Sequence, residues 1–268
     1  MPAAFDPGLI DSLTDTALAM ADAAAVETMR FFRSGDLDTR SKGAVFDPVT
    51  AGDRAGELAM RAVLHDRRPD DGVLGEELGA QAGTTGLTWV LDPIDGTRAY
   101  LAGAPTWGTL IAVNDGGAPI LGLIDQPHTG ERFFGSPRGA WLNDRWSRRA
   151  IAARPPRPLA EAIVMTTFPE VGTPEEGAAF RAVAERAQLT RYGLDCYAYA
   201  LVAAGHVDLV IEAGLESYDI QGPMAVVAAA GGCVSDWQGG PAEAGGRVIA
   251  AANREIHAEA LALLAQAK

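Results

Sequence analysis

An apolar run that leads directly into two aspartates and a glycine constrains this chain more than any other part of its sequence. Trp89-Val90-Leu91 predicts a buried strand, and Asp92-Pro93-Ile94-Asp95-Gly96-Thr97 predicts a tight turn at its end. The two carboxylates of this hexapeptide stand three positions apart, so they can point at one place with the Ile94 carbonyl between them. Oxygen ligands of this kind select Mg²⁺, Mn²⁺ or Ca²⁺ over metals that prefer thiolates. An Asp-Gly turn can also be an ordinary strand ending, and the acidic pair Glu76-Glu77 upstream is what favours a metal site.

The length and composition are those of a globular protein. The chain has 268 residues, of which 48% are hydrophobic and 21% charged, enough to bury a full core. Its one break in composition, Arg154-Pro155-Pro156-Arg157-Pro158, predicts a boundary between residues 1–153 and 154–268, two halves of one compact unit. No apolar run reaches the roughly 18 residues of a membrane span, and residues 1–6 lack the pattern of a signal peptide. With only two cysteines, these features predict a cytoplasmic protein.

The net charge limits the partners that this chain can have. A formal net charge of −13 argues against nucleic acid, whose phosphates need a basic surface. The same charge would oppose an anionic phosphate substrate, unless bound divalent cations reversed the local sign. We therefore expect part of the acidity to serve metal binding and the remainder to serve solubility.

Hydrophobic periodicity and capping residues predict helices and strands in both halves. The expected helices cover residues 9–33, a segment starting near Thr50, a segment starting at Thr173, and residues 196–204, 220–230 and 256–267. The expected strands cover residues 88–91, 109–113, 120–124, 131–134, 162–165 and 207–211. In the first half we expect these strands to form an antiparallel, half-buried sheet. Capping boxes are expected where a Thr precedes an acidic residue by three positions, at Thr50 with Asp53 and at Thr173 with Glu176.

Two motifs resemble the signatures of a known superfamily. Gly75-Glu76-Glu77 followed by Asp92–Thr97 resembles the first signature of the inositol monophosphatase superfamily of Mg²⁺-dependent phosphatases. The second signature is matched loosely by Tyr218-Asp219-Ile220-Gln221-Gly222 and Ala229-Ala230-Gly231-Gly232, with Tyr in place of Trp and Gln in place of Ala, while Asp219 is retained. The resemblance runs from Lys42 to Gly232 in the order of the superfamily. It implies an α+β fold, a layered α-β-α-β-α sandwich.

The resemblance also implies a metal centre with two or three Mg²⁺ ions per active site. The ligands of the first ion would be Glu76, Asp92 and the carbonyl of Ile94. Asp92 would bridge to a second ion held also by Asp95 and Asp219. The backbone amides of Gly96 and Thr97 would hold the phosphate, as the N-termini of helices commonly do.

The same resemblance implies the catalytic residues, which are Thr97, Asp53 and Glu76. The hydroxyl of Thr97, hydrogen-bonded to Asp53, would orient and help to deprotonate a metal-activated water for direct in-line attack, without a phosphoenzyme. Asp53 can also act as a favourable charge at the start of a helix, and both roles can hold together. Lys42 and Thr50 also fall on positions of the superfamily's pattern.

The substrate is expected to be recognised by the second half. Residues 191–197 and the run Tyr218-Asp219-Ile220 resemble the histidinol-phosphatase branch of the superfamily. Histidinol carries an ammonium group and an imidazole, and two carboxylates, Glu212 at a strand end and Asp195 at a helix start, would favour such a cation. Asp195 is as well explained as a plain N-cap.

Several alternatives remain beside histidinol phosphate at this point. Inositol monophosphate, a sugar bisphosphate and a 3′-phosphonucleotide would undergo the same chemistry. A protein of a different class, a catalytically silent metal-binding regulator, would have no reason to keep the pair Thr97 and Asp53. The resemblance further implies a homodimer that acts on a small phosphorylated substrate.

Overall fold

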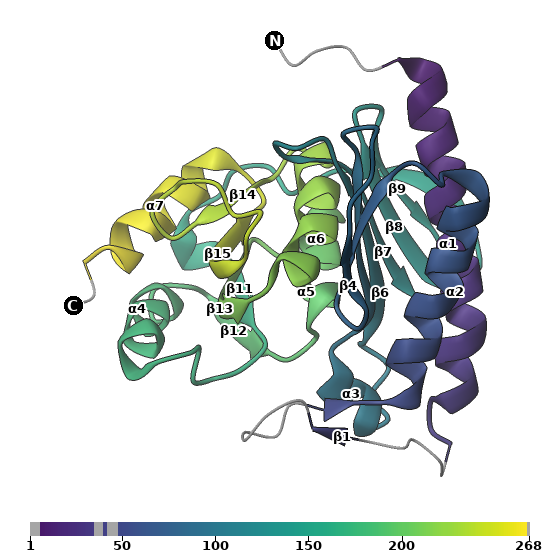
Figure 1. Ribbon diagram of the computed structural model, residues 1–268. Coiled ribbons are helices and arrows are strands. Elements are labelled where there is room, and N and C mark those ends of the chain that lie inside the picture. The colour runs from purple at the N-terminus through teal and green to yellow at the C-terminus, as the bar shows by residue number, and fades with distance from the viewer. Residues whose placement is uncertain (1–5, 35–39, 42–47, 267–268) are drawn as a thin grey trace.

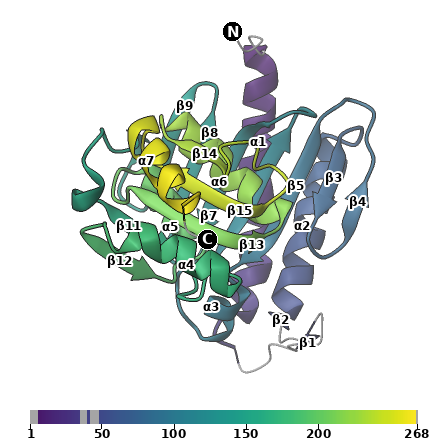
Figure 2. The ribbon, with the colours of Figure 1, turned by 90° about the vertical axis from the view of Figure 1, so that its left-hand side faces the viewer.

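Alternating layers of helix and sheet make up the structure (Figure 1). The computed structural model describes residues 6–34, 40–41 and 48–266. From one side to the other, the helical layers are α1 (Pro7–Phe31) with α2 (Ala51–Arg67), then α5 (Cys196–Ala203) with α6 (Ser217–Ala229), then α4 (Pro174–Ala184) with α7 (Arg254–Leu264). Figure 2 looks onto α4 and α7 in front of the second sheet. The predicted α+β fold with α-β-α-β-α layering is confirmed.

The first sheet has eight strands in the order β10-β9-β8-β7-β6-β5-β3-β4. The four predicted strands pair antiparallel as expected and are β5 (Thr88–Asp95), β6 (Gly108–Asn114), β7 (Pro119–Gln126) and β8 (Glu131–Ser136). Four further strands were not predicted: β3 (Gly72–Gly75), which is parallel to β5, β4 (Gly79–Gln81), β9 (Gly139–Asn143) and β10 (Arg148–Ile151). The expectation of a half-buried sheet was wrong. Residues 108–113 of β6 are all buried, because helices cover both faces.

The second sheet has five strands in the order β12-β11-β13-β15-β14. The two predicted members are β11 (Ile163–Thr166) and β13 (Leu209–Leu215), and β13 continues four residues beyond its expected end. The three others were not predicted: β12 (Leu189–Tyr192), β14 (Cys233–Asp236) and β15 (Gly246–Ala251). β11 is parallel to both of its neighbours, whereas β15 is antiparallel to β13 and β14. The remaining short elements are β1 (Arg40–Ser41), β2 (Pro48–Val49), α3 (Thr97–Leu101) and the 3₁₀ turn η1 (Leu159–Glu161).

Capping residues set the starts of the helices. Both predicted capping boxes are present: the N–H of Thr50 donates to Asp53 Oδ2 at 2.8 Å, and the N–H of Thr173 donates to Glu176 Oε2 at 2.8 Å. Three helices begin earlier than expected, α1 by two residues, α6 by three and α7 by two. In α7 the cause is Asn253, whose side chain accepts from the N–H of Ile256 at 3.0 Å. Over the described ranges, no helix is both long enough and apolar enough to cross a membrane.

The two halves share one core. Strands of the first sheet end at Ile151 and those of the second begin at Ile163, on either side of the proline-rich segment. Side chains from both halves pack in one hydrophobic cluster, which includes Leu110, Phe133, Tyr199 and Val226. The division at residues 153 and 154 therefore stays a prediction about chain organisation, and the core joins the halves into one body.

Helix α6 lies directly against glycines of the first sheet. A Cβ atom at Gly135 of β8 would approach the Cα of Val226 to 2.5 Å, and one at Gly122 of β7 would collide with the carbonyl of Gly222. Real Cβ atoms do not come so close, so the backbone of α6 needs glycine at both positions. This contact fixes the depth at which α6 sits between the sheets.

We predict that Gly135→Ala destabilises the protein by roughly 1–3 kcal/mol, because the added methyl group forces α6 away from the sheet. Thermal unfolding should show a fall in Tm of several degrees, at roughly 2–4 °C per kcal/mol. Gly117→Ala is the control, since Gly117 is exposed and a Cβ there would contact only its neighbour Asp115 at 3.4 Å. Equal Tm values for the two variants would contradict this account of the α6 contact.

Candidate active site

A β-bulge in β5 brings two predicted ligands to one face of the first sheet. Asp92 pairs with Leu110 of β6 and Asp95 with Gly108, so three steps along β5 oppose two along β6. In a regular strand, residues three positions apart face opposite sides, and one extra residue corrects this. Ligand oxygens of Asp92, Asp95 and Asp219 all lie within 4.8 Å of one another. The turn begins later than predicted, because β5 continues through Asp95.

Backbone amides hold these carboxylates in place. Asp92 is 1% exposed, and its Oδ1 accepts from the N–H of Ile94 at 2.9 Å. Oδ2 of Asp95 accepts from the N–H of Cys196, the first residue of α5, at 2.6 Å. Oδ2 of Asp219 accepts from the N–H of Glu216 at the start of α6 at 2.7 Å. The bond from Asp95 to α5 joins the first half of the chain directly to the second.

A second group of acidic side chains lies beside the first. Ligand oxygens of Asp53 on α2 and of Glu76 and Glu77 in the β3–β4 turn lie within 4.8 Å of one another. The resemblance had grouped Glu76 with Asp92 and the Ile94 carbonyl instead. Both descriptions meet at Glu76, because its charge also raises the pKa of Asp92, after the larger effect of burial. Glu77, the second residue of the acidic pair, is also a member of this group.

The hydrogen bond expected between Thr97 and Asp53 is absent from the described part of the chain. The hydroxyl of Thr97 donates to the carbonyl of Ile94 at 3.1 Å. Oδ2 of Asp53 accepts from both the N–H and the hydroxyl of Thr50, at 2.8 and 2.6 Å. The expectation of a direct bond was wrong, because the Thr97 hydroxyl is directed to the carbonyl of its own turn and Asp53 to the capping box.

Gly96 begins α3 and lies against Asp195. Its φ of +81° is a left-handed conformation that favours glycine, and a Cβ there would approach Cγ of Asp195 to 2.8 Å. The first N–H groups of α3 have no partner within the helix. Asp195 holds the N-cap position of α5 with φ +47°, yet its side chain makes no capping hydrogen bond. The explanation of Asp195 as a plain N-cap is therefore wrong, since its carboxylate faces the Gly96 turn instead.

A pocket of about 410 Å³ opens onto these residues. Its walls come from both halves and include Glu76, Asp95, Thr97, Asp195, Glu212 and Asp219. Pockets that bind small molecules usually fall in this size range. Asp53 and Asp92 are each 1% exposed and do not line it.

Glu212, predicted to bind substrate, is fixed in the pocket by two residues that sequence reasoning missed. Its Oε1 accepts from the N–H and the hydroxyl of Thr167, and its Oε2 accepts from the hydroxyl of Tyr199 at 2.7 Å. Tyr199 lies one helical turn after Asp195, so helical spacing could have suggested it. Thr167 follows β11 without any motif to mark it. The carboxylate of Glu212 thus has a single defined orientation.

The acidic residues raise one another's pKa values. Burial, then repulsion from Glu76, Asp95 and Asp219, raises the pKa of Asp92 well above its ordinary value. Burial, then the charges of Asp195 and Asp219, does the same for the pKa of Asp95. The pKa values of Asp53, Asp195 and Asp219 rise to about 7, with burial as the largest cause in each. Clusters of carboxylates whose pKa values are raised by burial and mutual repulsion are common at functional sites.

These donors fit a hard divalent cation. All are oxygens, and in each of two groups of three residues the ligand oxygens lie within 4.8 Å of one another. A cation would relieve the repulsion that helps to raise the pKa values of these residues. The carbonyl of Ile94 is adjacent, although its recorded partner is the hydroxyl of Thr97. Lys42, the start of the resemblance, lies outside the described residues.

Comparison with known proteins agrees with this geometry. The model of the inositol monophosphatase family matches residues 10–268. The bifunctional phosphatase IMPL2, chloroplastic, of Arabidopsis thaliana is 37% identical over 94% of this chain and 75% of its own. The histidinol-phosphatase of Streptomyces coelicolor is 35% identical over 96% of this chain and 98% of its own. An inositol monophosphatase structure from Zymomonas mobilis matches with a TM-score of 0.82 and 38% identity, over 94% of this chain and 98% of its own.

Sequence and structure comparisons thus agree over nearly the whole length of the chain. These relatives are named as phosphatases, but the names refer to different phosphate esters. The comparisons therefore identify the class of reaction and leave the substrate open. This protein belongs to the inositol monophosphatase family and is a phosphatase of that family.

Proposed function

We propose that this protein is a Mg²⁺-dependent hydrolase of phosphate monoesters whose substrate is histidinol phosphate. The observation that carries the proposal is the convergence of acidic groups from both halves on one pocket, next to a fixed carboxylate, Glu212. The match to a histidinol-phosphatase over 96% of the chain supports the choice of ester. A cytoplasmic location, expected from the composition, and a homodimer, implied by the resemblance, belong to the same proposal.

The acidic residues would hold the cations. Asp92, Asp95 and Asp219 form one ligand group, and Glu76 with its neighbour Asp53 extends it. A bound divalent cation neutralises phosphate charge and lowers the pKa of water toward neutrality. We propose two or three such ions per site, in keeping with the number of carboxylates.

The residues of the chain would then orient the reactants. The N–H groups of Gly96 and Thr97, at the left-handed turn that starts α3, would bind phosphate oxygens. The hydroxyl of Thr97 would position the attacking water, and the carboxylate of Asp53 would receive its proton. Because no direct bond joins Thr97 to Asp53, a water between the two side chains would connect them.

Charge selects the organic part of the substrate in this proposal. Glu212 and Asp195 line the same pocket, and the charge of Glu212 raises the pKa of Asp195, after the larger effect of burial. Two carboxylates so close together favour a cationic group such as the ammonium of histidinol. Arg98 also lines the pocket, where its guanidinium lies 4.9 Å from the ring centre of Phe168.

A second candidate ester is inositol monophosphate. The observation that favours it is the 38% identity to the Zymomonas mobilis inositol monophosphatase. Specificity constants for histidinol phosphate, inositol monophosphate, fructose bisphosphate and a 3′-phosphonucleotide would separate the candidates. A catalytically silent regulator would release no phosphate from any of them, with or without Mg²⁺.

We predict that Asp92→Asn lowers phosphate release by at least about 10³-fold, because a charge that gathers the cations is lost. The fold should survive, since an Asn oxygen can still accept from the N–H of Ile94. Phosphate release and thermal unfolding, measured on the same preparation, check both statements. Wild-type turnover in a folded Asp92→Asn protein would contradict the metal model.

We predict that Mg²⁺ stabilises the protein more at pH 8 than at pH 6. The pKa values of Asp53, Asp195 and Asp219 rise from 3.8 to about 7 on folding, so protonation favours the metal-free folded state. This stability is complete below about pH 4 and is lost as the pH rises through about 7. Cations replace the missing protons, and their binding therefore strengthens as the pH rises.

The measurement is the Tm at both pH values, with Mg²⁺ and with a chelator. The chelated protein should unfold at a lower temperature at pH 8 than at pH 6. The Mg²⁺-induced rise in Tm should be larger at pH 8. A rise that is equal at both pH values, or larger at pH 6, would contradict the prediction.

We predict that Glu212→Gln raises KM for histidinol phosphate by about tenfold or more, because a charged hydrogen-bond acceptor is lost. The KM for inositol monophosphate, which has no ammonium group, should change much less. Glu216→Gln is the matched control, since Glu216 lines the same pocket but is exposed. Equal changes in KM for the two esters would remove the assigned role of Glu212.

A further inference from the structure

We propose that Glu57 is a positioning residue that holds the turn carrying Glu76 against α2 and thereby sets the geometry of the metal site. This inference rests on the proposed function, because it assigns Glu76 to the metal site. Glu57 is absent from the motifs that mark the site in the sequence. It is 0% exposed, four residues after Asp53 on the same helix.

The carboxylate of Glu57 binds the backbone of the acidic turn. Its Oε2 accepts from the N–H of Glu77 at 2.7 Å, and its Oε1 accepts from the N–H of Leu78 at 3.2 Å. Glu76 directly precedes these two residues, and its own N–H donates to the carbonyl of Leu91 in β5 at 3.1 Å. The peptide around Glu76 is therefore held by β5 on one side and by Glu57 on the other.

The close approach of Glu57 requires glycine on the other side. A Cβ at Gly75, the residue before Glu76, would overlap the carboxylate of Glu57. Gly75 has no left-handed φ, so the backbone conformation does not demand glycine here. The glycine of the Gly-Glu-Glu motif is instead explained by the space that Glu57 occupies.

Arg61 completes this arrangement. Its Nε lies 2.8 Å from Glu57 Oε1, and its Nη2 donates to the carbonyl of Gly79 at the far side of the turn. Arg61 is one helical turn after Glu57, so both residues lie on the same face of α2. The arginine neutralises a buried charge and also binds the turn directly, which gives Glu57 one defined orientation.

Helix α2 thus carries both an acidic residue of the site and the residue that positions the turn. Asp53 supplies a carboxylate to the acidic group, and Glu57, at i+4, holds the backbone that presents Glu76 and Glu77 to the same group. These side chains repel one another when charged, so the turn needs an anchor that does not depend on their attraction. Partners beyond the ligands themselves commonly change metal affinity by about 10–100-fold.

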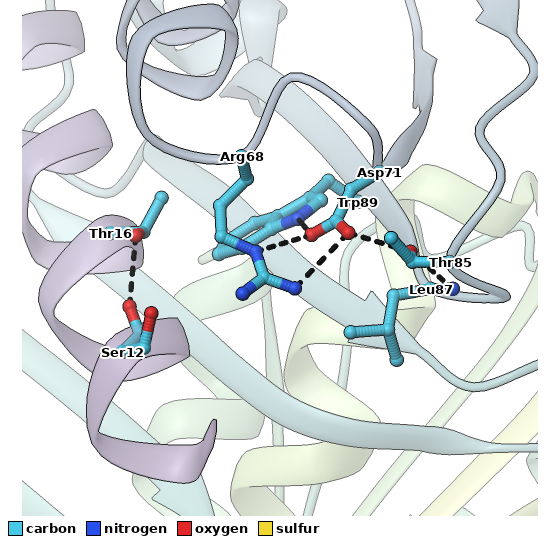
Figure 3. A network of polar contacts seen from close by, with 7 residues as sticks. All are labelled: Ser12, Thr16, Arg68, Asp71, Thr85, Leu87 and Trp89. Atoms are coloured by element: carbon cyan, nitrogen blue, oxygen red, sulfur yellow. Dashed lines mark hydrogen bonds and ion pairs between the residues drawn. The ribbon is translucent and has the colours of Figure 1, made fainter. Parts of the chain in front are cut away.

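A matched control exists at the opposite end of β3 (Figure 3). Asp71 lies directly before β3, whereas Glu76 lies directly after it. Like Glu57, Asp71 is buried, with 4% of its surface exposed. Its carboxylate accepts from Arg68, from the hydroxyl of Thr85 and from Nε1 of Trp89. Asp71 therefore resembles Glu57 in burial, in its arginine partner and in the number of donor residues, but it lies at the other end of the strand.

The test compares Glu57→Gln, Arg61→Met and Asp71→Asn as full-length proteins freed of metal. Binding of Mn²⁺ alone is measured by calorimetry, and Tm is measured with chelator present. Glu57→Gln should weaken Mn²⁺ binding by about 10-fold or more, because an amide nitrogen cannot accept from a backbone N–H. Arg61→Met should change affinity in the same direction and by less. Asp71→Asn should lower Tm to a similar degree and leave Mn²⁺ affinity at the wild-type value.

Enzyme assays add a readout that a general loss of stability would not give. In Glu57→Gln the Mg²⁺ concentration for half-maximal activity should rise by the same factor, while KM for substrate at saturating Mg²⁺ stays unchanged. Wild-type Mn²⁺ affinity in Glu57→Gln, or equal weakening in Asp71→Asn, would overturn the proposal. If Glu57→Gln does not fold, Arg61→Met decides, and unchanged affinity there overturns it.

The outcomes also separate this proposal from the proposed function. A wild-type protein that binds Mn²⁺ and releases phosphate, alongside a Glu57→Gln variant of equal affinity, removes only the positioning role. A wild-type protein that binds no divalent cation removes both.

Discussion

Repulsion between carboxylates that are buried or half-buried is the constraint on which the rest of the structure depends. Asp92, Asp95 and Asp219 bring ligand oxygens within 4.8 Å of one another, and Glu76 acts on Asp92 from the neighbouring group. Burial makes each charge more costly, and proximity adds to that cost. A chain would not assemble such a cluster for its stability. A cation that bound there would reverse the local sign, which would account for such a cluster in a protein of net charge −13.

The fold resists this repulsion with backbone amides. Asp92 is bonded to the N–H of Ile94, Asp95 to that of Cys196, and Asp219 to that of Glu216. Each of these donors lies at the end of a strand or the start of a helix, where N–H groups lack partners within the element. The same termini that need acceptors therefore supply the bonds that the carboxylates need. The layered architecture brings these ends together between the two sheets.

The sequence predicted those features that are encoded locally. The capping boxes at Thr50 and Thr173 were found because each depends on two residues three positions apart. Strands β5 to β8 were found because their apolar runs are long, whereas β3, β4 and β9 were missed because they are short and contain several small or polar residues. The ligand candidates Asp92 and Asp95 were found from the hexapeptide that follows an apolar run, whereas Asp219 was found through resemblance to a family.

Features that depend on contacts between distant segments could not be predicted. Tyr199 and Thr167 bind Glu212 only after β11, α5 and β13 have packed together. A hydrogen bond between Thr97 and Asp53 was expected from the resemblance, which gave no sign that the hydroxyl of Thr50 would donate to Asp53. The role of Glu57 could not be predicted either, because no residue near it in the sequence indicates a contact with residues 75–78.

The bulge in β5 has a consequence for how this region can change in evolution. Deleting any single residue between Asp92 and Asp95 would restore regular pairing with β6, and the strand itself would gain order. The same deletion would keep both aspartates on one surface of the sheet, but it would remove the bulge across which the N–H of Ile94 binds Asp92. Natural variation should therefore preserve the number of residues in this stretch as strictly as its two aspartates.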